Sequence, residues 1–211
     1  MSTSIPKDSE IQVTLRPVSR DNWRDVAKLE VTAAQREYVS EPCRYLALCS
    51  YGGDWKPLAV CLGDQVIGFL MWVVDPADGS CWLGGIIIDQ QYQRRGYGRQ
   101  AVQGAIAMLA GEHGYQDFAL SYNPANLVAS HLYGSLGFVE TDEWEDDEVV
   151  ARLLLESNAL DNGRMNESAT NRAAGTPMDE NSSTCRGVRC APRTPELVWE
   201  YSKPIVSMTI G

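Results

Sequence analysis

The sequence predicts an α/β fold in which about four helices flank a mixed, mostly antiparallel sheet of seven strands. Short apolar runs rich in β-branched residues are separated by turn sequences such as GD and DPADG, which is typical of strands joined by hairpins. Other segments repeat apolar residues at helical spacing. Along the chain the order is β-α-α-β-β-β-α-β-α-β-β, as expected for helices packed against a sheet.

The first quarter of the chain is expected to hold one strand and two helices. Apolar and polar residues alternate over 12–18 and predict the strand. Asp21 stands where a helix N-cap is favoured, and apolar residues recur at helical spacing from Trp23 to Ala34. A shorter helix is expected over 44–49. The run 57–89 then contains three strands joined by two turns, and so predicts an antiparallel meander.

The second half of the domain adds two helices and three strands. Apolar residues at helical spacing predict helices over 101–109 and 127–136, each followed by glycine, which commonly ends a helix. Strands are expected over 117–122, 138–141 and 148–155. The acidic segment DEWEDDE, residues 142–148, is expected to form the loop between the last two strands.

The composition changes near residue 156. Residues 1–156 carry the whole net charge of −10, whereas the remaining residues hold equal numbers of acidic and basic side chains. That remainder is rich in Asn, Ser, Thr, Gly and Pro and has no apolar period, so it buries too little surface to offset the entropy of ordering. We expect a flexible N-terminus (1–10), one folded domain (11–155) and a low-complexity, disordered tail (156–211) with a short docking strand over 197–210.

Charge and cysteine usage limit the classes of partner. An acidic surface disfavours nucleic acid and favours cationic partners, although solubility alone also accounts for it. Two histidines and six cysteines without a CxxC pair do not match a His-rich or zinc-ribbon site. No signal peptide core opens the sequence, and no apolar run reaches the ~18 residues of a membrane span. We therefore expect no metal, no membrane, no nucleic acid, and a reducing cytoplasm.

A glycine-rich stretch follows the last strand of the meander. The sequence QRRGYG, residues 93–98, comes directly after the apolar run LGGIIID and opens a helix. Glycine lets the backbone approach a ligand closely, and the N–H groups at a helix N-terminus suit a pyrophosphate. The spacing fits neither a Walker loop nor a Rossmann fingerprint. A basic surface turn is the alternative interpretation.

This Q-x-x-G-x-G resembles motif A of the GCN5-related N-acetyltransferases, which bind acetyl-CoA. Downstream, NPANLVASHLYGSLGFVE resembles motif B of that family: an asparagine, a tyrosine seven residues later, and then LGF. LRPVSRDNWRDVAKLEV, GFLMW, LSYNPAN and LYGSLGFVETDE are similar to the bacterial diamine and spermine/spermidine acetyltransferase branch. The resemblance covers about residues 11 to 155. It implies the GNAT fold, acetyl-CoA as co-substrate and direct acetyl transfer to a primary amine of a small polyamine or diamine; a homodimer is compatible with it.

The resemblance also implies a cofactor site. Ile86, Ile87 and Ile88 would pair with pantetheine through their backbone, while their side chains pack the core. Asn126 and Ser130 would hydrogen-bond the cofactor, although Asn126 can equally cap its helix. The pyrophosphate would be held by the glycine-rich loop, whose implied residues are Gln93, Arg94, Arg95, Gly96, Tyr97, Gly98 and Arg99.

Tyr133 is the general acid that the resemblance implies, because a phenol protonated at neutral pH can protonate a departing thiolate. The alternative is a tyrosine packed against the sheet. The amine itself is protonated at neutral pH, so a base or a water relay must remove a proton. Glu30 is the candidate base, and it would share one face of the expected first helix with Glu37, seven residues on. Glu41 lies just beyond, and a solvated helix face is the alternative for all three.

Other residues are expected around the amine. Glu37, Tyr38 and Tyr122 would line its channel, and the acidic segment 142–148 would attract a cation, with Trp144 offering a cation–π face. Gly84–Gly85 departs from the bulky or charged residues of relatives, so it either widens the pocket or introduces a bulge. Two other functions stay open: acetylation of another amine, such as a protein N-terminus or an antibiotic, and a non-catalytic acetyl-CoA-binding regulator.

Overall fold

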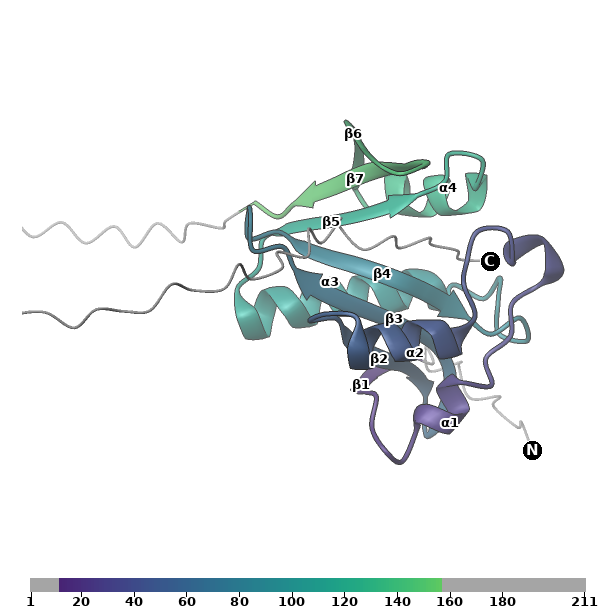
Figure 1. Cartoon of the computed structure of the whole chain (residues 1–211). Helices are drawn as coiled ribbons and strands as arrows, with labels where there is room; N and C mark the ends of the chain where they lie inside the picture. Colours follow the sequence, from purple (N-terminus) through teal and green to yellow (C-terminus); the bar gives the residue numbers. More distant parts are fainter. Residues whose placement is uncertain (1–11, 157–211) are drawn as a thin grey trace, which may run out of the picture. The chain divides into compact units, whose positions relative to one another are not determined.

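The computed structural model describes residues 12–156, which fold into a seven-stranded sheet flanked by helices (Figure 1). The strands are β1 (Thr14–Pro17), β2 (Lys56–Leu62), β3 (Gln65–Val74), β4 (Cys81–Ile88), β5 (Asp117–Tyr122), β6 (Val139–Glu145) and β7 (Glu148–Leu154). The helices are α1 (Trp23–Val26), α2 (Pro42–Tyr51), α3 (Tyr97–His113) and α4 (Leu127–Ser135), with a 3₁₀ helix η1 (Ala33–Gln35). The strand order is β1-β2-β3-β4-β5-β7-β6.

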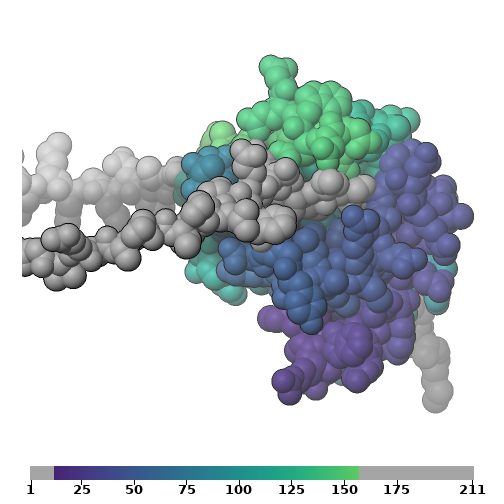
Figure 2. Space-filling model, viewed as in Figure 1, coloured from purple at the N-terminus to yellow at the C-terminus, as the bar shows by residue number. Residues whose placement is uncertain are grey.

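The sheet is antiparallel except where β4 meets β5. This confirms the predicted α/β class with a mixed, mostly antiparallel sheet. In the space-filling view, the green residues of the β6–β7 hairpin and the purple residues near the start of the described chain lie at opposite ends of the visible face (Figure 2), as the strand order requires. The predicted N-terminus, the tail beyond residue 156 and its docking strand lie outside the described residues.

The core lies on both faces of the central strands. Every residue of β4 is buried, which explains why its sequence is continuously apolar rather than alternating. Helices α1 and α2 lie over one face of the sheet, and α3 and α4 lie over the other (Figure 1). The predicted apolar face of α3, from Ala101 to Leu109, is buried against the sheet. Within residues 12–156, no helix is long and apolar enough to cross a membrane.

The strands β4 and β5 pair only at their first residues. Their ladder consists of Cys81 with Phe118 and Trp82 with Ala119. Beyond this point β4 stays paired with β3 up to Ile88, and β5 stays paired with β7 up to Tyr122. The two strands therefore part toward their C-terminal ends, and no described strand pairs with this edge of β4. A ligand in an α/β sheet commonly binds beyond the carboxyl ends of such strands.

A β-bulge interrupts β4 where it leaves β5. Met71 pairs with Gly84 and Phe69 with Ile87, so β4 uses one residue more than β3 over this stretch. Gly85 has a φ of 58°, in the left-handed region. A Cβ at this position would also lie 3.3 Å from ring atoms of Phe69 and Tyr45. Of the two consequences considered for Gly84–Gly85, the structure shows the bulge.

The predicted first helix is wrong in its length and its cap. It ends at Val26 instead of Ala34, and its N-cap is Asn22 rather than Asp21. Main-chain bonding explains the early end, because Glu30 donates its N–H to Asp89 and its carbonyl accepts from the Gln90 N–H at 2.7 Å. These bonds take the backbone groups that a continuing helix would use.

The acidic segment 142–148 is mostly strand, not loop. β6 continues to Glu145 and β7 begins at Glu148, so the turn consists of residues 146 and 147. Cross-strand pairing of Trp144 with Val149 and of Glu145 with Glu148 accounts for the extension. Asp146, with a φ of 53°, adopts the left-handed conformation that a tight turn requires.

Candidate active site

The edge of β4 at the strand opening offers backbone groups beside a buried surface. The side chains of Ile86, Ile87 and Ile88 are buried. No described strand pairs with the β5-facing edge of this segment. The backbone of this edge can therefore pair with a ligand that lies alongside it, while the side chains pack the core.

The loop that follows β4 has the geometry of an anion cradle. Arg94 and Gly96 both have left-handed φ angles, 60° and 79°, and Gly96 is the N-cap of α3. Such turns direct successive N–H groups toward one point, and the helix N-terminus adds partial positive charge. The left-handed conformation costs a non-glycine residue roughly 1–2 kcal/mol. A Cβ built on Gly96 would meet nothing within 4 Å, so the left-handed φ rather than crowding is what favours glycine there.

The side chains of this loop have different roles from its backbone. The Gln93 amide donates to the Ile88 carbonyl at 2.8 Å and to Gln35 Oε1 at 2.9 Å, and so ties the loop to β4 and η1. Arg99 donates to the hydroxyl and the carbonyl of Ser135, at the end of α4. Arg94 and Arg95 are exposed. Gly98 is buried and Tyr97 half-buried at the start of α3. A contact of these seven residues with a cofactor stays a prediction.

On the other side of the opening, Asn126 and Ser130 belong to the start of α4. Asn126 Oδ1 accepts a hydrogen bond from the Ala129 N–H at 3.2 Å, so this side chain caps the helix. Ser130 is half-buried. The cap is one of the two roles foreseen for Asn126, and a bond from either residue to a cofactor stays a prediction.

Tyr133 lies on the same helix and is fully buried. Its ring centroid is 5.4 Å from that of Tyr122 and 6.0 Å from that of Phe138. Burial raises the pKa of Tyr133 far above its ordinary value, and the charge of Glu148 and the neighbouring phenols of Tyr122 and Tyr45 raise it further. The Tyr133 phenol is therefore protonated throughout the physiological range, as a general acid must be.

Glu148 is a buried acidic residue that the sequence did not single out within the segment 142–148. It appeared there as the end of an acidic loop, but it is 3% exposed, and its Oε2 accepts a hydrogen bond of 2.7 Å from the Ser121 hydroxyl. A sequence signal did exist. Glu148 stands two residues before Val150 in an apolar strand, so alternation places both on the same face.

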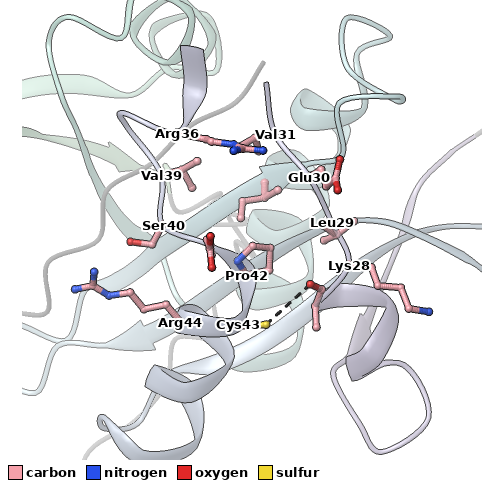
Figure 3. Close-up of a pocket in the computed structure, with 13 residues that line it drawn as sticks. Lys28, Leu29, Glu30, Val31, Arg36, Val39, Ser40, Pro42, Cys43 and Arg44 are labelled. Atoms are coloured by element: carbon pink, nitrogen blue, oxygen red, sulfur yellow. Dashed lines mark hydrogen bonds between the residues drawn. The ribbon is translucent and has the colours of Figure 1, made fainter. Parts of the chain in front are cut away.

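A pocket of about 700 Å³, which is the candidate site for the acceptor amine, lies between the segment after α1 and the start of α2 (Figure 3). Ile87 of β4 also lines it, which connects it to the strand opening. The pocket carries acidic Glu30 and Glu41 but also basic side chains. Figure 3 shows two of these, Lys28 and Arg44, extending in opposite directions at its two sides.

Glu30 and Glu37 do not share a helix face, because the helix ends before either residue. Glu30 lines the pocket, is exposed, and accepts a hydrogen bond of 2.9 Å from the Gln90 amide. Glu37 is exposed and does not line the pocket, and Tyr38 is half-buried beside it in the chain. The expectation that Glu30 and Glu37 share one helix face is therefore wrong, whereas their roles stay predictions.

Two further side chains that were predicted to contact the amine, Tyr122 and Trp144, do not line the pocket. Tyr122 is buried at the end of β5, and its hydroxyl donates to Glu140 Oε1 at 2.5 Å. Trp144 is 57% exposed on β6, so its ring is open to solvent.

Among residues 12–156, no three His, Cys, Asp or Glu side chains gather into a group that could hold a metal ion.

Comparison with known proteins gives one family and several relatives. The model of the acetyltransferase (GNAT) family matches residues 23–138. A spermine/spermidine N(1)-acetyltransferase of Bacillus subtilis (strain 168) is 25% identical over 134 residues, which cover 61% of this chain and 88% of the relative.

Solved structures share the fold. Spermidine N-acetyltransferase from Vibrio cholerae, in complex with CoA and spermine, aligns with a TM-score of 0.55 and 21% identity, over 67% of this chain and 94% of the other. AAC(6')-Ib, in complex with paromomycin and acetyl-CoA, aligns with a TM-score of 0.59 and 15% identity, over 72% of this chain and 99% of the other.

Proposed function

Because the chain belongs to the acetyltransferase (GNAT) family, we propose that it transfers the acetyl group of acetyl-CoA to a primary amine of a small polyamine or diamine. Acetyl-CoA-dependent acetyl transfer is the activity of the family. The polyamine is supported by the spermine/spermidine acetyltransferase that is 25% identical to this chain. A cytoplasmic setting and a homodimer stay predictions.

The observation that carries the proposal is the edge of β4 that no described strand covers, between two groups suited to acetyl-CoA. The left-handed loop at Arg94 and Gly96 lies at one end of that edge and suits a pyrophosphate. Tyr133, a buried and protonated phenol, follows β5 on the opposite side of the opening. A pantetheine arm paired with β4 would bring its thioester between the two strands.

In the proposed reaction, the amine nitrogen bonds to the thioester carbonyl carbon and the C–S bond then breaks. A backbone N–H of β4 near Ile87 or Ile88 would stabilise the negative charge on the carbonyl oxygen. Tyr133 would give its proton to the departing sulfur. Glu30 and Glu41, which line the pocket, would attract the cationic amine. Tyr38 and Glu37 would bind parts of a long substrate further out.

A second candidate is acetylation of an amine that also carries an acidic group, such as a peptide N-terminus. The observation that favours it is the mixed charge of the pocket, where Lys28, Arg36 and Arg44 stand beside Glu30 and Glu41. Cationic side chains repel a polycation and attract a carboxylate. AAC(6')-Ib shares the fold, and so an antibiotic amine belongs in the same comparison.

The test is a thiol-release assay with a panel of amines. Putrescine, spermidine, spermine, a short peptide and an aminoglycoside are each offered with acetyl-CoA to the full-length protein. We expect release of CoA with the polyamines. Release with the peptide alone would favour the second candidate, and release with the aminoglycoside alone would favour an antibiotic amine as the substrate. Tight acetyl-CoA binding by calorimetry without release for any amine would favour a non-catalytic regulator.

A further inference from the structure

Glu148 is the buried carboxylate at the opening between β4 and β5. In the β5–β7 ladder, Ser121 pairs with Val150 and Tyr122 with Val149. Since paired residues share a face and faces alternate along a strand, Glu148 and Ser121 lie on one face and Tyr122 on the other. The 2.7 Å bond from Ser121 confirms the shared face and fixes the orientation of the carboxylate.

Tyrosines approach Glu148 from both faces of the sheet. The ring of Tyr133 packs on Tyr122, on the α4 face. Tyr45, from α2, stacks on Phe69 with ring centroids 6.1 Å apart, on the opposite face. The charge of Glu148 raises the pKa of both Tyr133 and Tyr45, although burial is the larger cause for each. Glu148 directly precedes Val149, the partner of Tyr122 at the end of β5, and so lies at the end where β4 and β5 part.

A hydrogen bond connects Tyr45 to the lining of the pocket. The hydroxyl of Tyr45 accepts a hydrogen bond of 3.2 Å from the Ser40 N–H, and Ser40 lines the pocket. Ile87, on the strand that would hold the thioester, lines the same pocket. An amine that passes from the pocket along Ile87 to the opening therefore approaches the end of the β5–β7 ladder, where Glu148 precedes Val149.

We propose that Glu148 receives the ammonium group of the substrate at this point and takes one of its protons, an inference that rests on the acetyl transfer proposed above. Glu148 is then a catalytic residue, and Ser121 is the residue that positions it. Glu30, exposed and bonded to Gln90 at the pocket, attracts the amine without deprotonating it.

The reaction balances with these two groups. The ammonium gives a first proton to Glu148, which passes it to solvent. The free nitrogen lone pair bonds to the acetyl carbon, and the C–S bond breaks with its electron pair on sulfur. Tyr133 gives its proton to the sulfur, and the second proton of the nitrogen returns to Tyr133. One ammonium ion and one thioester thus become one amide, one thiol and one released proton.

A buried carboxylate is suited to this step. An alkyl ammonium has a pKa of about 10.4, so the reactive free amine is scarce at neutral pH. A carboxylate out of water pairs strongly with the ammonium and accepts its proton as the nitrogen begins to bond. Among residues 12–156, the groups around Glu148 include Ser121 from β5 and Glu145 across the β6–β7 pair, and its charge acts on Tyr133 of α4 and Tyr45 of α2.

The test compares Glu148→Gln with the wild type, both as the full chain, on two nucleophiles. One is the amine that the wild type acetylates best. The other is its alkoxyamine analogue, in which R–O–NH₂ replaces R–CH₂–NH₂ and is uncharged at neutral pH. With the amine we expect kcat to fall at least ~100-fold, the usual loss for a missing general base. With the alkoxyamine we expect a rate near that of the wild type.

The pH profile gives a second readout. Without the carboxylate, only the free amine in solution reacts. The kcat/KM of Glu148→Gln for the amine should then rise about tenfold per pH unit up to the pKa of the amine. The wild-type profile should level off at lower pH. Ser121→Ala should show a smaller loss with the amine and none with the alkoxyamine.

Controls keep the outcomes distinct. Glu112→Gln makes the same chemical change at an exposed position of α3 and should leave both rates unchanged. Acetyl-CoA binding and thermal unfolding check that Glu148→Gln is folded. If that variant does not fold, Glu148→Asp, which keeps the carboxylate, is used in its place. In that case Glu148→Asp should retain the wild-type pH dependence, and a tenfold rise per pH unit would contradict the proposal.

Equal losses with both nucleophiles, or no loss with either, overturn the role of Glu148 while the wild type remains active. A wild type that transfers acetyl to no amine overturns the proposed function itself.

Discussion

The side-chain amide of Gln93 donates a hydrogen bond of 2.9 Å to Gln35, and so the loop that opens α3 is joined to η1 on the acceptor side. The same amide holds the Ile88 carbonyl at the end of β4. A parallel pair of bonds joins Glu30 to Gln90 through main chain and side chain. The expected cofactor loop and the acceptor segment thus share one hydrogen-bonded framework.

We predict that Gln93→Leu weakens the binding of both substrates, acetyl-CoA and the amine. The change removes two hydrogen bonds, each of which contributes about 1 kcal/mol. The KM values for acetyl-CoA and for the amine should both rise by about fivefold to tenfold, as measured by steady-state kinetics. Gln103→Leu, at an exposed position of α3, is the control. A rise in the KM for acetyl-CoA alone would show that the loop acts without the acceptor segment.

Tyr133→Phe should lose about 100-fold or more in kcat and leave acetyl-CoA binding nearly unchanged. The reason is that the departing thiolate loses its proton donor, whereas the buried ring still packs against Tyr122 and Phe138. Stopped-flow kinetics and calorimetry measure the two quantities. Tyr115→Phe, in the aromatic cluster with Trp72, is the matched control. Unchanged turnover would remove Tyr133 from the mechanism.

The buried phenols also predict how stability depends on pH. Burial raises the pKa of Tyr45 to about 12, against 10 for an ordinary tyrosine, and raises that of Tyr133 further. The native state therefore keeps protons that the unfolded chain releases above pH 10. Their contribution to stability is complete below pH 10 and is lost as pH rises from 10 toward 12.

Urea unfolding at pH 8 to 11.5 measures this loss. The free energy of unfolding should decline less steeply with pH in Tyr45→Phe than in the wild type, because one of the titrating groups is gone. A decline of the same slope in both proteins would show that Tyr45 does not contribute.

Gly85→Ala should destabilise the domain by about 1–2 kcal/mol, the cost of a left-handed φ for a residue with a Cβ. Its φ is 58°, and the added Cβ would press on Tyr45 and Phe69 at 3.3 Å. Gly111→Ala is the control, because a Cβ there meets nothing within 4 Å and alanine favours a helix. The first variant should lower the urea midpoint and the second should raise it. A neutral Gly85→Ala would mean that β4 does not need the bulge.

The elements with a strong local pattern were predictable from the sequence. The continuous apolar run before Asp89 specified β4, and the spacing from Ala101 to Leu109 specified α3, because each pattern reflects burial against the sheet. The short α1 was not predictable, since the bonds of Glu30 to Asp89 and Gln90 bridge residues some 60 positions apart. No local pattern records such bonds.

The candidate site could likewise be predicted from the sequence only in part. The positions of Gln93 and Tyr133 followed from their motifs, but the direction of the Gln93 amide toward Gln35 did not. Glu148 was grouped with its acidic neighbours because a run of acidic residues is a stronger sequence signal than the alternation of a few apolar positions. Its burial depends on the pairing of β7 with β5, which only the folded sheet defines.

The most direct test of the account is the stoichiometry of its products. The full-length protein is incubated with acetyl-CoA and spermidine, and CoA and N-acetylspermidine are quantified together by mass spectrometry. The account predicts equal amounts of the two, formed at a rate that Tyr133→Phe reduces about 100-fold. Acetyl-CoA that stays intact with spermidine and with every other amine of the panel would contradict it.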